Sequence, residues 1–158
     1  MIGTSETTFS PLIKLTREQL MQVFFAMEGL DKADYEGETG FVDVSEGRWY
    51  SPALKWAKTE GITNGIKEDT FGIGQYVTRE QLATFIMNYV KYKNGDIASN
   101  ADLSSFSDAD DISDWAVAGI EFCVEKGIIN GRANGTLDPR TPANRAELAQ
   151  ILKQYAAM

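Results

Sequence analysis

The chain has 158 residues, of which 43% are hydrophobic and 24% charged, and its formal net charge is -8. This balance is typical of a globular domain, and the acidic excess without any basic run argues against nucleic-acid binding. Histidine is absent and Cys123 is the single cysteine, which excludes Ser-His-Asp and Cys-His catalysis, histidine-ligated metal sites and an internal disulfide. No apolar run approaches the ~18 residues of a membrane span, and the first residues lack the features of a signal peptide.

An internal repeat dominates the sequence. The tetrapeptide Thr16-Arg17-Glu18-Gln19 recurs 62 residues later with Thr78, and a third copy begins with Asn144, 66 residues after the second. Upstream of the last two copies, a Phe-x-Asp segment, a Trp and a Gly-Ile-x-Asn-Gly segment also recur. We predict one domain over 1–158, made of a partial motif 1 (1–30), motif 2 (41–94) and motif 3 (106–158).

Motifs 2 and 3 are each predicted to begin with a helix, over 49–59 and over 114–126. Gly61 and Gly127 follow these helices and are expected to take the left-handed conformation that ends a helix. Trp56 and Cys123 lie within the two segments and are predicted to be core residues, because a reactive thiol needs a nearby cation or a helix N-terminus. The corresponding helix of motif 1 is missing.

A second helix closes each of the three motifs and carries apolar residues at i, i+3, i+4 and i+7, which is one face of a helix. Phe9, Phe71 and Leu137 precede these helices and are predicted to fill the core. We predict an all-α fold of tandem helix–loop–helix repeats in a pseudo-threefold arrangement around a central helical bundle. The apolar stripes are Leu20, Val23, Phe24 and Met27; Leu82, Phe85, Ile86 and Tyr89; and Leu148, Ile151, Leu152 and Tyr155.

The repeated tetrapeptides are predicted to be capping boxes, in which Thr or Asn caps the helix and Gln or Glu three residues later closes back on it. A capping box does not explain why arginine follows the cap in all three copies, at Arg17, Arg79 and Arg145. A cation is unfavourable at the positive end of a helix, whereas an arginine beside free amides can bind an anion. The alternative is a repeated salt bridge to Asp43, Asp108 or another acidic residue.

Two further features have an ordinary structural interpretation beside a functional one. Trp49 and Trp115, at the start of the first helices, are either core residues or platforms that stack on a sugar ring. The acidic segment 108–114 lacks the ligand spacing of a calcium-binding EF-hand loop. We expect it to be a polar loop, and no metal or cofactor motif is found.

The repeated motifs resemble the S-layer homology (SLH) family over nearly the whole chain. The matching segments are Phe41-x-Asp43…Trp49, 61–65, 70–71 and 78–81, then Phe106-x-Asp108…Trp115, 127–131, 135–139 and 144–147, with Gly3, 8–11 and 16–19 from the partial motif. The resemblance implies non-covalent anchoring of exported proteins to a bacterial cell wall. The implied partner is a secondary cell-wall polysaccharide linked to peptidoglycan, often pyruvylated, which the tetrapeptide arginines meet in grooves between motifs.

Two functional hypotheses follow. The first is an extracellular, non-enzymatic cell-wall anchoring module, whose parent protein is expected to carry a signal peptide. The alternative is a protein-interaction or self-assembly scaffold without glycan binding. Because the first helix of motif 1 is missing, we expect the Leu20/Val23/Phe24 stripe to be partly uncovered, and the chain either to self-associate or to have reduced stability. The predicted ligand-binding residues are Arg17, Arg79, Arg145, Trp49, Trp115, Asp43, Asp108, Gly65 and Gly131.

Overall fold

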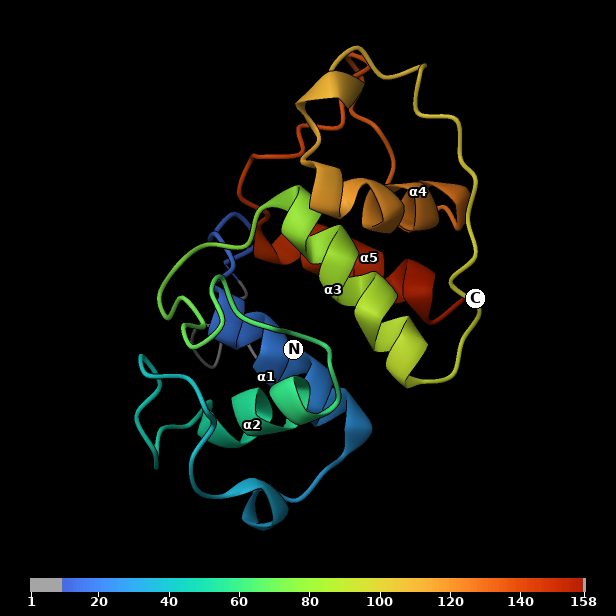
Figure 1. Cartoon of the computed structure of the whole chain (residues 1–158). Helices are drawn as coiled ribbons and strands as arrows, with labels where there is room; N and C mark the ends of the chain where they lie inside the picture. The colour runs from blue at the N-terminus through green and yellow to red at the C-terminus, as the bar shows by residue number, and fades with distance from the viewer. Residues whose placement is uncertain (1–9, 158) are drawn as a thin grey trace. The chain divides into compact units, whose positions relative to one another are not determined.

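The computed structural model describes residues 10–157, and regular structure within this range is helical (Figure 1). Strand-like pairing among these residues is limited to isolated bridges. The predicted all-α class is therefore confirmed, whereas the pseudo-threefold arrangement stays a prediction. The helices are α1 (Arg17–Glu28), α2 (Ser51–Thr59), α3 (Arg79–Tyr92), α4 (Val117–Glu125) and α5 (Arg145–Tyr155), with 3-10 turns at Lys32–Tyr35, Ala109–Asp111 and Asp114–Ala116.

The described residues form two compact units, the α1–α2 unit (residues 15–76) and the α3–α5 unit (residues 10–14 and 77–157). In the α1–α2 unit, the second helix of motif 1 packs against the first helix of motif 2. The Phe25 ring meets the ring of the fully buried Trp56 edge-on, with 5.8 Å between centroids. Trp56 is thus a core residue, as predicted.

The apolar face of α1 is rotated relative to the predicted stripe. Leu20 and Phe24 are fully buried, but the other two buried apolar positions are Met21 and Phe25, while Met27 is 44% exposed. Phe25 is drawn inward because it contacts Trp56 on α2. The expected uncovered surface is therefore confined to the edge of α1 that contains Met27 and the half-buried Val23.

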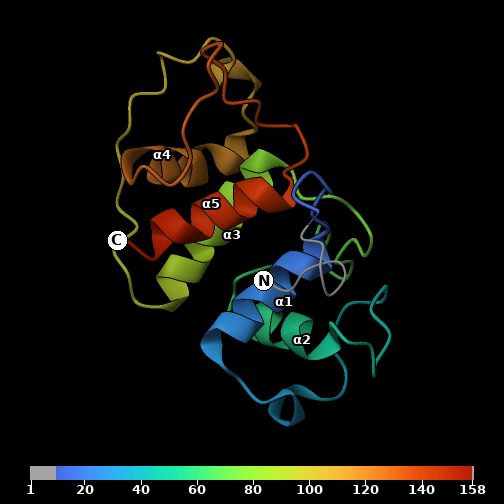
Figure 2. The same ribbon diagram turned by 180° about the vertical axis from the view of Figure 1, so that it is seen from behind.

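The α3–α5 unit repeats this packing one motif later, with α3 against α4. All four stripe residues of α3 are buried, as predicted; in α5, Leu148 and Ile151 are buried and the last two stripe residues are half-buried. Seen from behind, α5 lies along α3 (Figure 2), and the rings of Tyr89 and Tyr155 are in contact with 5.7 Å between centroids. Gly119 of α4 permits a close approach to α3, because a Cβ there would lie 2.9 Å from the Thr84 amide nitrogen.

The first helices of motifs 2 and 3 begin two or three residues later than predicted. Helix α2 starts at Ser51, and α4 starts at Val117 after a 3-10 turn. Gly61 and Gly127, which follow the two helices, have the predicted positive φ, at 69° and 66°. Cys123 is fully buried in α4, and burial raises the pKa of its thiol to about 12.

The loops between the two helices of each motif lead into the core. Phe71 and Leu137 are buried, as predicted, while Phe9 lies outside the described residues. A short antiparallel bridge is found at the first residue of each tetrapeptide, which is the capping residue. In each case the bridge partner lies two positions before the first residue of a different tetrapeptide. The bridged pairs are Thr16 with Tyr76, Thr78 with Pro142, and Asn144 with Lys14.

Candidate ligand-binding site

The predicted capping boxes are closed by both hydrogen bonds at the start of α3 and α5. At the start of α1 the Gln19 side chain accepts from the Thr16 amide at 3.1 Å, but the Thr16 hydroxyl accepts no hydrogen bond from the helix. In α5 the Asn144 side chain accepts from the Glu147 amide at 2.9 Å, and the Glu147 carboxylate accepts from the Asn144 amide at 2.9 Å. Thr78 and Gln81 exchange the same pair of bonds at 3.3 and 3.2 Å. The capping residues therefore fix the first turn of each helix and the backbone position of the arginine within it.

The arginines of α1 and α3 each reach into the loop of the following motif. The Arg17 Nε donates to the Phe71 carbonyl at 2.9 Å, and the Arg79 Nε donates to the Leu137 carbonyl at 2.6 Å. Burial lowers the pKa of Arg17 to about 10 against the opposing charges of Asp43 and Glu18. Arg145 occupies the equivalent position in α5, where its amide donates to the Ile13 carbonyl at 3.1 Å.

Asp43 and Asp108 bind loop amides. Asp43 accepts hydrogen bonds from the amides of residues 71–73 at 2.7–3.0 Å, and Asp108 accepts from those of residues 137 and 138 at 2.8 Å. Burial would raise the pKa of Asp43, but the three amide donors outweigh it and hold the pKa below its usual value. Both carboxylates therefore shape the loop that the arginine of the preceding motif enters, and direct ligand contact by them stays a prediction.

Arg79 is the charged centre of the α3–α5 unit. Its Nη1 forms an ion pair with the Glu147 carboxylate at 2.9 Å, and its Nη2 donates to the Asn130 carbonyl at 3.2 Å. The acidic partner that the salt-bridge alternative requires is thus present at Arg79, although it is neither Asp43 nor Asp108. Burial lowers the pKa of Arg79, and Glu147 opposes this.

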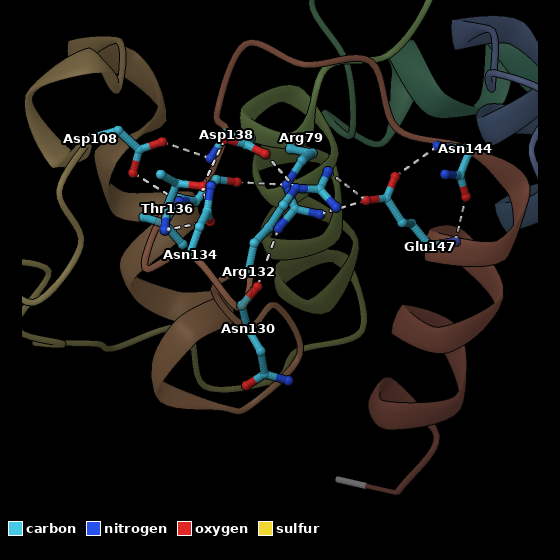
Figure 3. A network of polar contacts seen from close by, with 10 residues as sticks. Arg79, Asp108, Asn130, Arg132, Asn134, Thr136, Asp138, Asn144 and Glu147 are labelled. Atoms are coloured by element: carbon cyan, nitrogen blue, oxygen red, sulfur yellow. Dashed lines mark hydrogen bonds and ion pairs between the residues drawn. The ribbon is translucent and has the colours of Figure 1, made fainter.

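A second guanidinium lies beside Arg79, at a position that the repeat pattern did not indicate. Arg132 is ion-paired with Asp138 and, through Nη2, with the same Glu147 oxygen that Arg79 contacts, at 3.0 Å (Figure 3). Its side chain is 38% exposed, compared with 7% for Arg79. The available signal was a loop arginine directly after Gly131, where motif 2 has the apolar Ile66.

Arg79 and Arg132 together line two adjoining hollows of the α3–α5 unit. The first has a volume of about 500 Å³, and the second, of about 360 Å³, extends along α5. Both contain guanidinium and amide groups, which can bind carboxylates and hydroxyls. The first is lined by Arg79, Asn130, Gly131, Arg132, Ala133 and Asn134. The second adds Ile128, Ile129, Asn144, Ala146, Glu147, Gln150, Ile151 and Gln154.

The two predicted glycines differ in what their amides do. The Gly65 amide donates to the Thr63 hydroxyl at 3.1 Å. Gly131 lines the first hollow, and within residues 10–157 no acceptor is found for its amide. Glycine is also required sterically at 131, because a Cβ would lie 2.4 Å from the Phe106 ring.

The two predicted tryptophans are surface residues. Trp49 is 52% exposed and Trp115 is 56% exposed, so neither is a core residue. Trp115 does not line either hollow beside Arg79. The structure thus supplies the exposed rings that stacking on a sugar requires, but does not bring Trp115 into the arginine site.

The repeated segments that build this site match a known family. Residues 40–83 and 105–149 match the S-layer homology domain, and the chain belongs to this family. The matched segments contain Asp43, Arg79, Asp108, Arg132 and Glu147, so most of the site described above lies within them.

Similar proteins include a surface-layer protein, an anchoring protein and an enzyme. The chain is 28% identical over 96% of its length to a surface-layer 125 kDa protein of Lysinibacillus sphaericus. It is 27% identical over 92% to a cellulosome-anchoring protein of Acetivibrio thermocellus, and 29% identical over 95% to the exoglucanase XynX of the same species. It spans only 12%, 33% and 14% of these proteins, so the match to the enzyme involves a small part of it. Within residues 10–157, no helix is both long and apolar enough to cross a bilayer.

Proposed function

We propose that this chain is a cell-wall anchoring module, located on the bacterial cell surface, that binds an acidic secondary cell-wall polysaccharide without covalent attachment. Family membership and relatives that include surface-layer and cellulosome-anchoring proteins support the anchoring role. We propose further that the whole chain acts as one non-enzymatic domain and that the ligand carries pyruvate ketals.

The unused donors at Arg79 are the observation that carries the proposal. A guanidinium has five N–H groups, and three of those of Arg79 are used, by Leu137, Asn130 and Glu147. Within the described chain no acceptor is found for the other two, and Arg79 borders both hollows. The fork geometry of these donors suits a carboxylate, which is the group that a pyruvate ketal adds to a sugar.

The surroundings of Arg79 suit a carbohydrate as well as a charge. Gly131, whose amide has no acceptor within the described chain, lines the same hollow, and Asn134, Gln150 and Gln154 are among the residues that line the two hollows. Such groups can both donate to and accept from sugar hydroxyls. In this proposal Arg79 binds the acidic group, while Arg17 and Arg145 bind the polysaccharide at the equivalent positions and Trp49 and Trp115 stack on sugar rings.

The experiment changes the ligand rather than the protein, because Arg79 also holds the loop and its replacement would disturb folding. The whole chain is cosedimented with protein-free sacculi of Lysinibacillus sphaericus, with the same sacculi after hydrofluoric acid has removed the polysaccharide, and with sacculi treated with mild acid to remove pyruvate. We expect binding to the first, none to the second and weakened binding to the third.

Equal binding to intact and stripped sacculi would refute the polysaccharide as ligand. Binding only to walls that retain their proteins would favour the alternative of a protein-interaction or self-assembly module. Unchanged binding after mild acid would refute the pyruvate component alone. Self-association, which stays a prediction, is measured by sedimentation velocity on the chain without ligand.

A further inference from the structure

We infer that Arg132 is a second ligand-binding cation of the Arg79 site, and that it makes the motif 3 loop selective for a more densely charged segment of polysaccharide than the motif 2 loop. This inference rests on the proposed function, because it concerns the same ligand. Its basis is the position of Arg132, its remaining donors and the residues that replace it in the other motifs.

The partners of Arg132 fix the position of its guanidinium but leave some of its N–H donors unused. Asp138 accepts from its Nε, and Glu147 accepts from its Nη2 at 3.0 Å. Within the described chain no residue accepts from its Nη1. Because two carboxylates fix the plane of the guanidinium, the remaining N–H groups are oriented before a ligand arrives, which lowers the entropic cost of binding.

Arg132 is also more accessible than Arg79. It borders both hollows and is 38% exposed, whereas Arg79 is 7% exposed. In Figure 3 the two guanidiniums lie side by side and share one oxygen of Glu147. Two cations that meet at one carboxylate repel each other in part, and the charge of Arg132 does lower the pKa of Arg79. A second anionic group supplied by the ligand would relieve this repulsion.

This charge arrangement belongs to motif 3 alone. By the offset of the repeat, motif 2 has Ile66 in place of Arg132, Gly72 in place of Asp138 and Gln81 in place of Glu147. Ile66 is 40% exposed, so the motif 2 loop presents an apolar group at this point. The polar loop of motif 3 therefore suits a polysaccharide segment with closely spaced acidic groups. The apolar loop of motif 2 suits the face of a sugar ring or a methyl group.

The test measures the NMR signal of the Arg132 side chain during ligand binding. The whole chain, labelled with ¹⁵N, is titrated with soluble polysaccharide released from Lysinibacillus sphaericus sacculi, and the arginine Nε–H signals are recorded. The signal of Arg132 is assigned by its loss in Arg132→Lys. We expect this signal to shift together with the amides of residues 131–134.

Three variants are then compared for binding to the same polysaccharide at low and high salt. Arg132→Ile introduces the residue of motif 2 and should weaken binding about tenfold, the loss expected for one charge-assisted hydrogen bond, with a smaller dependence on salt. Arg132→Lys keeps the charge without the fork and should fall between. Arg140→Ile, the control, removes an equal charge from an exposed residue that lines neither hollow and should change binding less than about twofold.

The outcomes separate this inference from the proposed function. An unmoved Arg132 signal while other signals shift, or wild-type affinity of Arg132→Ile, overturns the role of Arg132 and leaves the anchoring proposal intact. Absence of any shift in the wild-type chain refutes the anchoring proposal itself. Should Arg132→Ile fold poorly, the wild-type titration and Arg132→Lys still decide the question.

Discussion

Replacing Arg79 by lysine is expected to lower the free energy of unfolding of the α3–α5 unit by about 2–3 kcal/mol. An ammonium group retains the attraction to Glu147 but can reach one of the two carbonyls at most, whereas the arginine donates to Leu137 and Asn130 from separate nitrogens. A lost hydrogen bond to a charged group costs about 1.5–3 kcal/mol. Arg79→Met removes all three hydrogen bonds, one of which is the ion pair with Glu147, and should lower the free energy of unfolding by about 3–5 kcal/mol.

Urea unfolding at neutral pH measures both variants, with circular dichroism for total helix and Cys123 accessibility for the α3–α5 unit. Cys123 is fully buried in that unit, so its reaction with a thiol reagent reports opening of α4. Arg140→Lys is the matched control, because Arg140 is exposed and its replacement should change stability by less than about 0.5 kcal/mol.

Wild-type stability in both Arg79→Lys and Arg79→Met would refute the reasoning, since it would mean that the loop keeps its position without the guanidinium. If Arg79→Met were more stable than Arg79→Lys, burial of the charge would cost more free energy than its hydrogen bonds contribute.

Three further predictions follow from the core and the loops. Asp43→Asn leaves one acceptor oxygen for the amides of residues 71–73. It should lower the free energy of unfolding by about 1–3 kcal/mol at neutral pH. Because the folded pKa of Asp43 lies below its usual value of 3.8, this contribution is full above pH 3.8 and is lost as the pH falls through the folded pKa. The gap between wild type and variant in urea unfolding should therefore narrow in acid, and a constant gap would contradict the assignment. Gly119→Ala places a Cβ 2.9 Å from the Thr84 backbone and should cost about 1–3 kcal/mol through overpacking, measured by thermal unfolding; unchanged stability would mean that α3 and α4 separate at no cost. Cys123, buried and with a pKa raised to about 12, should react with a thiol reagent only in denaturant, and rapid labelling of the native chain would contradict its burial.

Local chemistry made part of the fold predictable from the sequence. The capping boxes and the left-handed Gly61 and Gly127 depend on residues close in the chain. Both glycines and the boxes of α3 and α5 are found, and in α1 only the Gln19 half of the box is formed. The stripe of α3 was predicted correctly, and all four of its residues are buried. The stripe of α1 was correct only in part, since the contact between Phe25 and Trp56 turns the helix, and such a contact depends on a distant segment.

The site was less predictable for the same reason. The sequence identified Arg79 by repetition but not its partners, because Glu147 lies 68 positions away and belongs to another motif. Arg132 breaks the repeat, and repetition can point only to positions that recur. Helices α2 and α4 begin two or three residues later than predicted, so Trp49 and Trp115 lie ahead of these helices rather than within them.

The arginine of one motif holds the loop of the next, so the segment that repeats in the sequence differs from the compact unit of the structure. A fragment cut at a motif boundary, such as 41–94, would retain the loop at residues 71–73 but lose Arg17, which donates to the Phe71 carbonyl. A fragment that begins before Arg17 and ends after the loop, such as 15–76, keeps this bond and the pairing of α1 with α2. Transplanting one repeat into a foreign protein should therefore work best when the cuts fall inside the motifs, ahead of the capping threonines.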